Sequence, residues 1–84
     1  MIRGMPNLSS HRQDPVLVAL GQTIRRIRKE RDMSQEQLAL SADVDMSYLG
    51  RVERGDNNVA VLRLKRIADA LGITMTALMT EAGL

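Results

Sequence analysis

Residues 33–55 read MSQEQLALSADVDMSYLGRVERG, and this stretch decides the fold. Ser34 and Gln37 form a capping box, in which two side chains satisfy backbone amides that have no partner at the start of a helix. The sequence therefore predicts a helix that begins at Gln35 and ends near Ser41.

A second short helix follows after a tight turn. It begins at Met46, and Gly55 is placed to end it in the left-handed conformation that glycine adopts without steric cost. Such a pair of helices lets one enter the major groove of a DNA duplex while the other braces it at a steep angle. Bracing requires apolar or small residues between the helices, and the stretch supplies them at Leu38, Ala39, Val44, Leu49 and Val52.

Composition favours a single helical domain. The chain has 84 residues, which is enough for one core and little else. It has one Tyr and no Phe, Trp or Cys, so its core is built from aliphatic residues that suit packed helices better than β-sheets. We therefore expect an all-α fold.

Three further helices are expected around the central pair. Asp14 and Pro15 begin the first, because an acidic cap and a residue without an amide both suit a helix start, and it runs to about Arg31. A fourth helix ends at Gly72, and Thr74 caps a short fifth helix. Apolar stripes at helical spacing mark the first and fourth helices at Leu17, Leu20, Ile24, Ile27, Val61, Leu64, Ile67, Ala68 and Leu71.

The chain from about Ile24 to Leu71 resembles the Cro and phage-repressor (XRE-type) helix-turn-helix family. The resemblance lies in MSQEQLA at 33–39, VERG at 52–55 and IADALGI at 67–73. It implies a compact five-helix, lambda-repressor-like DNA-binding domain over residues 14–84. Residues 1–13 have no period, and we expect them to be a flexible tail.

The resemblance also implies roles for individual residues. The helix from Met46 becomes the recognition helix, Gln35 contacts a DNA phosphate, and Glu53 pairs with an arginine of the first helix such as Arg28. The sequence departs from the family pattern at two places. Asp43 stands where the turn usually has Gly, and Ala60 replaces the usual Ser cap of the fourth helix, for which Asn58 is an alternative cap.

We expect the outward side chains of the recognition helix to be Met46, Ser47, Tyr48 and Arg51. An arginine can donate two hydrogen bonds to guanine in the major groove, which makes Arg51 the best candidate for reading a base. Ordinary exposed surface is the alternative for all four. Phosphate contacts that set register are expected from Gln35, Arg54, Asn57 and Asn58, although a simple turn also explains the two asparagines.

A homodimer on a palindromic operator is expected, because one recognition helix reads only about 4 or 5 base pairs. The expected dimer interface is an apolar surface of the last helix, helped by part of the fourth helix. The alternative is that the last helix only covers the core. The interface residues expected in the last segment are Met75, Leu78, Met79 and Leu84.

Other classes of function find little support. There is no nucleophile with a base, no paired acid set and no metal cluster, so we expect no enzyme activity, no cofactor and no metal; His11, the only histidine, is assigned no role.

No apolar run suggests a membrane span, and we expect a cytoplasmic protein. There is no room for a sensor domain, so no small-molecule effector is expected. RNA polymerase is a conceivable partner through Glu36 and neighbouring acids.

The expected function is therefore a sequence-specific DNA-binding transcriptional regulator. The one-domain architecture is similar to the controller proteins of restriction–modification systems, and also to small phage repressors and some antitoxins; we place the controller first. A protein-interaction module that keeps the fold but does not bind DNA is the rival interpretation. The operator, and the choice between activation and repression, stay open.

Overall fold

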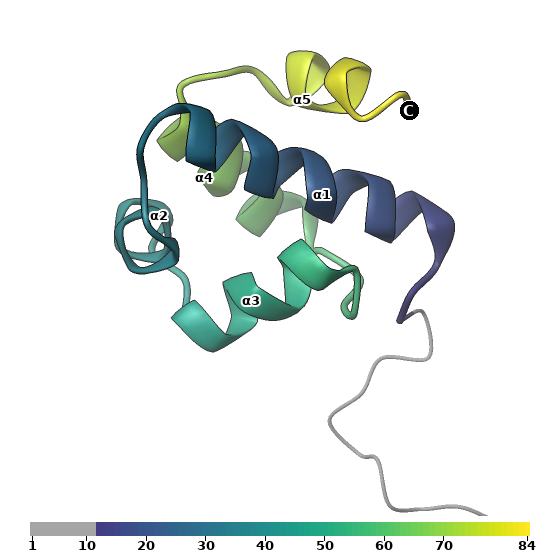
Figure 1. Ribbon diagram of the computed structural model, residues 1–84, viewed down its shortest axis with the longest axis horizontal. Helices are drawn as coiled ribbons and strands as arrows, with labels where there is room; N and C mark the ends of the chain where they lie inside the picture. Colours follow the sequence, from purple (N-terminus) through teal and green to yellow (C-terminus); the bar gives the residue numbers. More distant parts are fainter. Residues whose placement is uncertain (1–11) are drawn as a thin grey trace, which may run out of the picture.

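A computed structural model describes residues 12–84, and every regular secondary-structure element in that range is a helix. The five helices confirm the all-α, five-helix prediction (Figure 1). Residues 1–11, which include His11 and most of the expected tail, lie outside the described residues. The helices are α1 (Pro15–Glu30), α2 (Gln35–Ala42), α3 (Met46–Arg54), α4 (Val61–Leu71) and α5 (Met75–Glu81).

Local hydrogen bonds explain where the helices begin. The Ser34 hydroxyl accepts from the Gln37 amide at 3.0 Å, and the Gln37 side chain accepts from the Ser34 amide at 2.7 Å, so the capping box is confirmed. Asp14 accepts from the Val16 amide at 2.9 Å at the start of α1. Thr74 accepts from the amide three residues later at the start of α5. The sequence therefore located these helix starts correctly.

Two helices begin without a side-chain cap, and the expected cap of α4 by Asn58 is wrong. Asp45 stands at the N-cap of α3, but its side chain makes no capping hydrogen bond. Asn58 does not cap α4, whose N-cap is Ala60 and which has no side-chain cap. In contrast, Asp43 adopts the left-handed conformation, with φ 56° and ψ 50°, that the turn requires.

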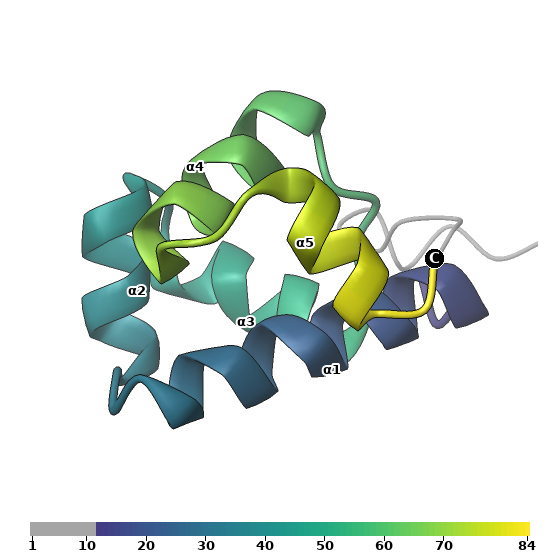
Figure 2. The same ribbon diagram turned by 90° about the horizontal axis from the view of Figure 1, so that it is seen from above.

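The helices enclose one aliphatic core. In Figure 1, α1 lies between α5 on one side and α3 on the other, and Figure 2 shows α2 and α4 on the remaining sides. This arrangement places α3 at the edge of the molecule with one face turned outward. None of the helices described is both long and apolar enough to cross a membrane. The largest fully buried side chains are Ile24, Leu38, Leu49, Val52, Ile67, Leu71 and Leu78.

A close backbone approach sets α3 against α1. A Cβ atom on Gly21 of α1 would lie 2.3 Å from the carbonyl oxygen of Val52 and 2.7 Å from that of Glu53. These are backbone atoms near the end of α3, so they cannot move aside as a flexible side chain would. Only glycine fits at this crossing.

Gly21→Ala is expected to lower the free energy of unfolding by about 1–3 kcal/mol, because the added methyl forces α1 and α3 apart. Alanine favours an isolated helix by about 1 kcal/mol, so helix propensity acts in the opposite direction. Urea unfolding followed by circular dichroism measures the change, with Gln22→Ala at the exposed neighbouring position as control. A Gly21→Ala protein as stable as the parent would contradict the close approach.

Candidate nucleic-acid interface

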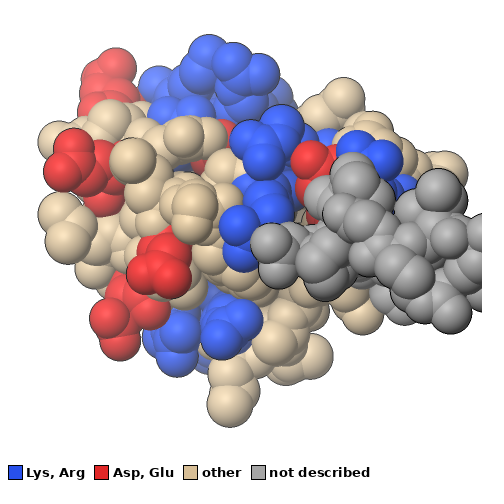
Figure 3. All heavy atoms as spheres, turned by 90° about the horizontal axis from the view of Figure 1, so that it is seen from below, with Lys and Arg blue, Asp and Glu red and all other residues tan. Residues whose placement is uncertain are grey.

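The outward face of α3 carries polar and flexible side chains. Met46 and Ser47 are exposed, Arg51 is half-buried, and the Arg54 side chain is 62% exposed. Seen from the side of α3, Lys and Arg side chains gather in separate groups with uncharged surface between them (Figure 3). A shallow depression of about 360 Å³, here called the outer hollow, is lined by Gln35, Met46, Ser47, Gly50, Arg51 and Arg54.

Tyr48 does not lie on this outward face, and its expected exposure is wrong. Its side chain joins the hydrophobic core and the residue is only 8% exposed. Tyr48 and Val52 are four residues apart and therefore lie on the same face of α3, so Tyr48 packs inward with Val52. Its ring faces the guanidinium groups of Arg51 and Arg63.

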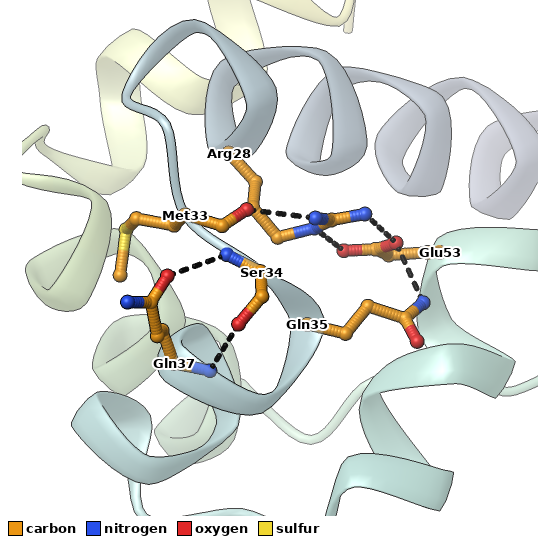
Figure 4. A network of polar contacts seen from close by, with 6 residues as sticks. All are labelled: Arg28, Met33, Ser34, Gln35, Gln37 and Glu53. Atoms are coloured by element: carbon orange, nitrogen blue, oxygen red, sulfur yellow. Dashed lines mark hydrogen bonds and ion pairs between the residues drawn. The ribbon is translucent and has the colours of Figure 1, made fainter.

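A buried ion pair braces the helix pair from behind. Arg28 of α1 donates from Nε and Nη2 to the two carboxylate oxygens of Glu53 in α3, at 2.7 and 3.1 Å (Figure 4). Arg28 also donates to the carbonyl of Met33, in the loop between α1 and α2, at 2.8 Å. The expected pairing of Glu53 with Arg28 is thus confirmed. It fixes α3 relative to α1 and to the entry of α2.

Gln35 extends this network to the surface. Its amide nitrogen donates to Glu53 at 3.0 Å, which orients the side chain at the start of α2 (Figure 4). A glutamine amide has two N–H donors, so one remains for another acceptor. Gln35 lies between the outer hollow and a second depression of about 450 Å³, which we call the α1–α2 hollow. Besides Gln35, the α1–α2 hollow is lined by Arg25, Arg28, Ser34, Glu53 and Arg54.

The loop after α3 holds Arg54 through a contact that sequence reasoning missed. Arg54 Nε donates to Asp56 at 3.1 Å, and the Gln13 amide donates to the same carboxylate at 2.7 Å and to the Arg54 carbonyl at 2.9 Å. Gln13 was expected in a flexible tail, but it is instead bound to this loop, also through its backbone amide to Gly55. Gln13 and Asp56 are 43 positions apart, which hides the pairing from any local pattern.

These hydrogen bonds act on the charge of Asp56. The Gln13 side-chain donor, then that of Arg54, lowers the pKa of the Asp56 carboxyl below its ordinary value, and the charge of Arg12 acts in the same direction. Arg12 lies 3.8 Å from the carboxylate. Asp56 therefore stays ionised and keeps the start of the domain attached to the end of α3.

The two asparagines of the loop lie apart from the outer hollow. Asn57 is half-buried and Asn58 is exposed. Asn58 lines a small depression with Asp14, Val16 and Leu17 at the start of α1. The structure thus brings Gln35, Met46, Ser47, Arg51 and Arg54 together and leaves Asn57 and Asn58 outside this set.

The chain is similar in sequence to known proteins. A family profile described as "Helix-turn-helix" matches residues 24–78. The control protein C.MunI of a Mycoplasma species is 34% identical over 67 residues, which cover 79% of this chain and 90% of that protein. The chain belongs to the helix-turn-helix family of Cro and phage-repressor (XRE) type. The resemblance predicted from the sequence is confirmed.

Solved structures extend the comparison. The restriction–modification controller protein C.AhdI from Aeromonas hydrophila is 42% identical, with a TM-score of 0.72 over 74% of this chain and 94% of that one. C.Esp1396I bound to a 25 base pair operator site is 27% identical, with a TM-score of 0.74 over 80% of this chain and 88% of that one. In this chain, α2 and α3 form the helix-turn-helix.

The apolar surface of this helix-turn-helix domain differs from the expected one. Leu78 is fully buried in the core, so the prediction that it lies on an exposed interface is wrong. Its side chain points from α5 toward the core, as a residue that covers the core would. Met75 and Met79 are half-buried and Leu84 is exposed. Among the described residues, larger apolar exposure lies at Val61 (68%) and Leu62 (75%) in the first turn of α4, and at Leu40 (75%) of α2.

Several basic residues of the domain have structural partners. Arg26 pairs with Glu81 at 2.6 Å and with Glu30 at 3.0 Å, which joins α1 to α5, and these hydrogen bonds raise the pKa of Arg26. Arg66 of α4 donates to carbonyls at the end of α2. Over residues 12–84, no group of His, Cys, Asp or Glu is arranged to hold a metal ion.

Asp56→Asn tests the attachment at the end of α3. Because the folded pKa of Asp56 is lowered, its charge stabilises the fold above its ordinary pKa of about 4, and this stability is lost as the pH falls through the folded value. The difference in unfolding free energy between parent and variant is therefore expected to be constant near neutral pH and to shrink below about pH 4. Urea unfolding at a series of pH values measures it.

Gln13→Ala provides the companion measurement. This variant loses the donor that lowers the pKa of Asp56 most, so its own stability should depend less steeply on acid pH than that of the parent. If the stabilities of the parent and of Asp56→Asn fall in parallel as the pH is lowered, the pKa of Asp56 is not lowered by folding, and this interpretation is wrong.

Proposed function

We propose that this chain is a sequence-specific, double-stranded DNA-binding transcriptional regulator that binds a palindromic operator as a homodimer. The observation that carries the proposal is the outward face of α3, which is polar, lies at the edge of the molecule and is braced from behind by the buried pair of Arg28 and Glu53. A rigid helix held in this way can enter a major groove without losing its orientation.

The side chains of this face suit two kinds of contact. Arg51, Ser47 and Met46 lie where base edges would meet α3, and a guanidinium suits the two acceptors of guanine. Gln35 and Arg54 lie at the border of the α1–α2 hollow, where they would hold a backbone phosphate and set the register. Asn57 and Asn58 lie off this surface, and we assign them to the turn.

We propose that the chain acts as the controller protein of a restriction–modification system. The similarity to C.MunI extends over 90% of that protein, and C.AhdI and C.Esp1396I share the fold over most of their length. A regulator of this kind acts where bacterial DNA lies, so we place the chain in the cytoplasm. It would work through its own concentration, without enzyme activity.

The dimer surface that we propose combines the start of α4 with the half-buried methionines of α5. Val61 and Leu62 expose most of their apolar surface, and α5 packs against α4. Met75 and Met79 keep part of their surface open, and Leu84 is exposed beyond them. A second copy that covers these residues in an isologous contact would remove this apolar area from water.

Arg51→Ala is expected to cost about 1–3 kcal/mol of discrimination at one base position in each half-site, because the bidentate contact to guanine is lost. Duplexes selected from a random pool, followed by competition binding, measure this preference. Arg54→Ala serves as the control, since loss of a phosphate contact weakens binding alike for all sequences. An unaltered base preference in Arg51→Ala would remove Arg51 as a reader. If the parent selects no duplex at either low or high salt, the proposed function is rejected.

Leu62→Asp is expected to abolish the dimer, because it buries a charge in the proposed apolar contact. Sedimentation velocity of the parent and the variant at equal concentrations reports the oligomeric state. Leu40→Asp is the matched control, since Leu40 of α2 is also 75% exposed but lies outside this surface. A Leu62→Asp protein that remains dimeric would exclude the start of α4 from the interface.

A further inference from the structure

A second basic depression lies across α3 from the α1–α2 hollow. It is formed between the turn that follows α2, the inner edge of α3 and the helix α4, and it measures about 400 Å³. We call it the arginine hollow, because three guanidinium groups line it, from Arg51, Arg63 and Arg66. Tyr48 forms another wall. Arg51 lines both this depression and the outer hollow, so the two are neighbours along α3.

Tyr48 orients two of these guanidinium groups. The Arg63 guanidinium carbon lies 4.9 Å from the centre of the Tyr48 ring, and that of Arg51 lies 5.9 Å from it. Both distances fall within the range of attraction between a cation and an aromatic face. The ring itself is held by the core, with 8% of the residue exposed. The ring therefore restricts the positions of the arginines.

Two hydrogen-bond donors that line the arginine hollow lack acceptors in the described part of the chain. The Tyr48 hydroxyl and Arg51 Nε are buried and have no hydrogen-bond partner among residues 12–84. Buried polar groups are paired in the great majority of cases, so two unpaired donors on residues that line the same hollow indicate a ligand that brings oxygen atoms. Arg66 differs, because it donates to the carbonyls of Ala42 and Asp43 at 3.0 and 3.3 Å.

Charge in the arginine hollow favours an anion. Asp43 and Asp45 also line it, but in the described part of the chain neither forms an ion pair with its arginines. Three guanidinium groups against two carboxylates leave an excess of positive charge. Guanidinium groups match phosphate oxygens through paired donors, which an exposed lysine cannot reproduce.

We propose that the arginine hollow binds a backbone phosphate of DNA, with Arg63 of α4 as its main contact. The proposal rests on the proposed function. A helix of about 10–12 Å diameter fills a major groove of about 12 Å, so the phosphates of both strands meet its two flanks. Gln35 and Arg54 would contact a phosphate on one flank of α3, and the arginine hollow would contact a phosphate on the other. The reading surface thus extends beyond α2 and α3 to α4.

Arg63→Ala is the test, and Lys65→Ala is the matched control. Lys65 lies on the same helix, carries the same charge and pairs with Asp69 at 2.7 Å, outside the arginine hollow. Binding to a selected duplex and to a scrambled one is measured over a series of salt concentrations. Arg63→Ala should weaken both complexes several-fold and lower the salt slope by about 0.9 for each half-site, while Lys65→Ala changes neither. Arg63→Lys should fall between parent and alanine variant.

Two outcomes of this experiment overturn the proposal. Equal affinities and slopes for Arg63→Ala and Lys65→Ala would show that no phosphate contacts Arg63. A lost base preference with an unchanged slope would make Arg63 a base reader. A parent that binds no duplex would instead reject the proposed function, and the DNA assignment of the hollow with it. Thermal unfolding of each variant verifies that it is folded.

A titration with inorganic phosphate separates the two sources of this anion. Tyr48 is the only tyrosine of the chain, so its ring protons report on the arginine hollow in an NMR spectrum without assignment of other residues. Shifts with phosphate, absent with chloride at equal ionic strength and lost in Arg63→Ala, support an oxyanion site. The same shifts with no effect of Arg63→Ala on duplex binding would make the ligand a free phosphate and overturn the DNA assignment.

Discussion

The buried pair of Arg28 and Glu53 is the interaction on which the arrangement of the helices depends. Its two side chains are only 8% and 2% exposed, so each charge would be costly without the other. Through Met33 and Gln35 the pair also contacts the loop before α2 and the first turn of α2. One ionic contact thus orients three helices, and α3 needs no contact on its outer side to stay in place.

Close backbone packing completes this support. Gly21 lets the end of α3 approach α1, and Gly55, with φ 77°, lies against Val18 where a Cβ would be 2.8 Å from the Val18 backbone. The end of α3 is therefore held by its inner face and by the loop that follows. The outer face therefore keeps its orientation without contacts to Met46 or Ser47, whose side chains stay free to read a groove.

The arginines of the chain divide by their partners. Arg26 joins α1 to α5, Arg28 is part of the core, and Arg66 donates to carbonyls at the end of α2, where a positive charge also suits the helix dipole. Among the described residues, these pairings leave Arg51 and Arg63 without ion pairs on the side of α3. The formal net charge of +2 is small, so their location matters more than the total.

The sequence by itself determined the helices and the family, because caps and end-glycines such as Ser34 and Gly55 act over a few residues. It also identified Arg28 and Glu53 through the family pattern. Only the tertiary structure decided that Tyr48 and Leu78 are buried, that Gln13 binds Asp56 and that Arg63 faces the Tyr48 ring. A tyrosine suits either a core or a surface, and the seven residues of α5 are too few to mark which apolar side chains face the core. Contacts between distant residues form only when the helices pack.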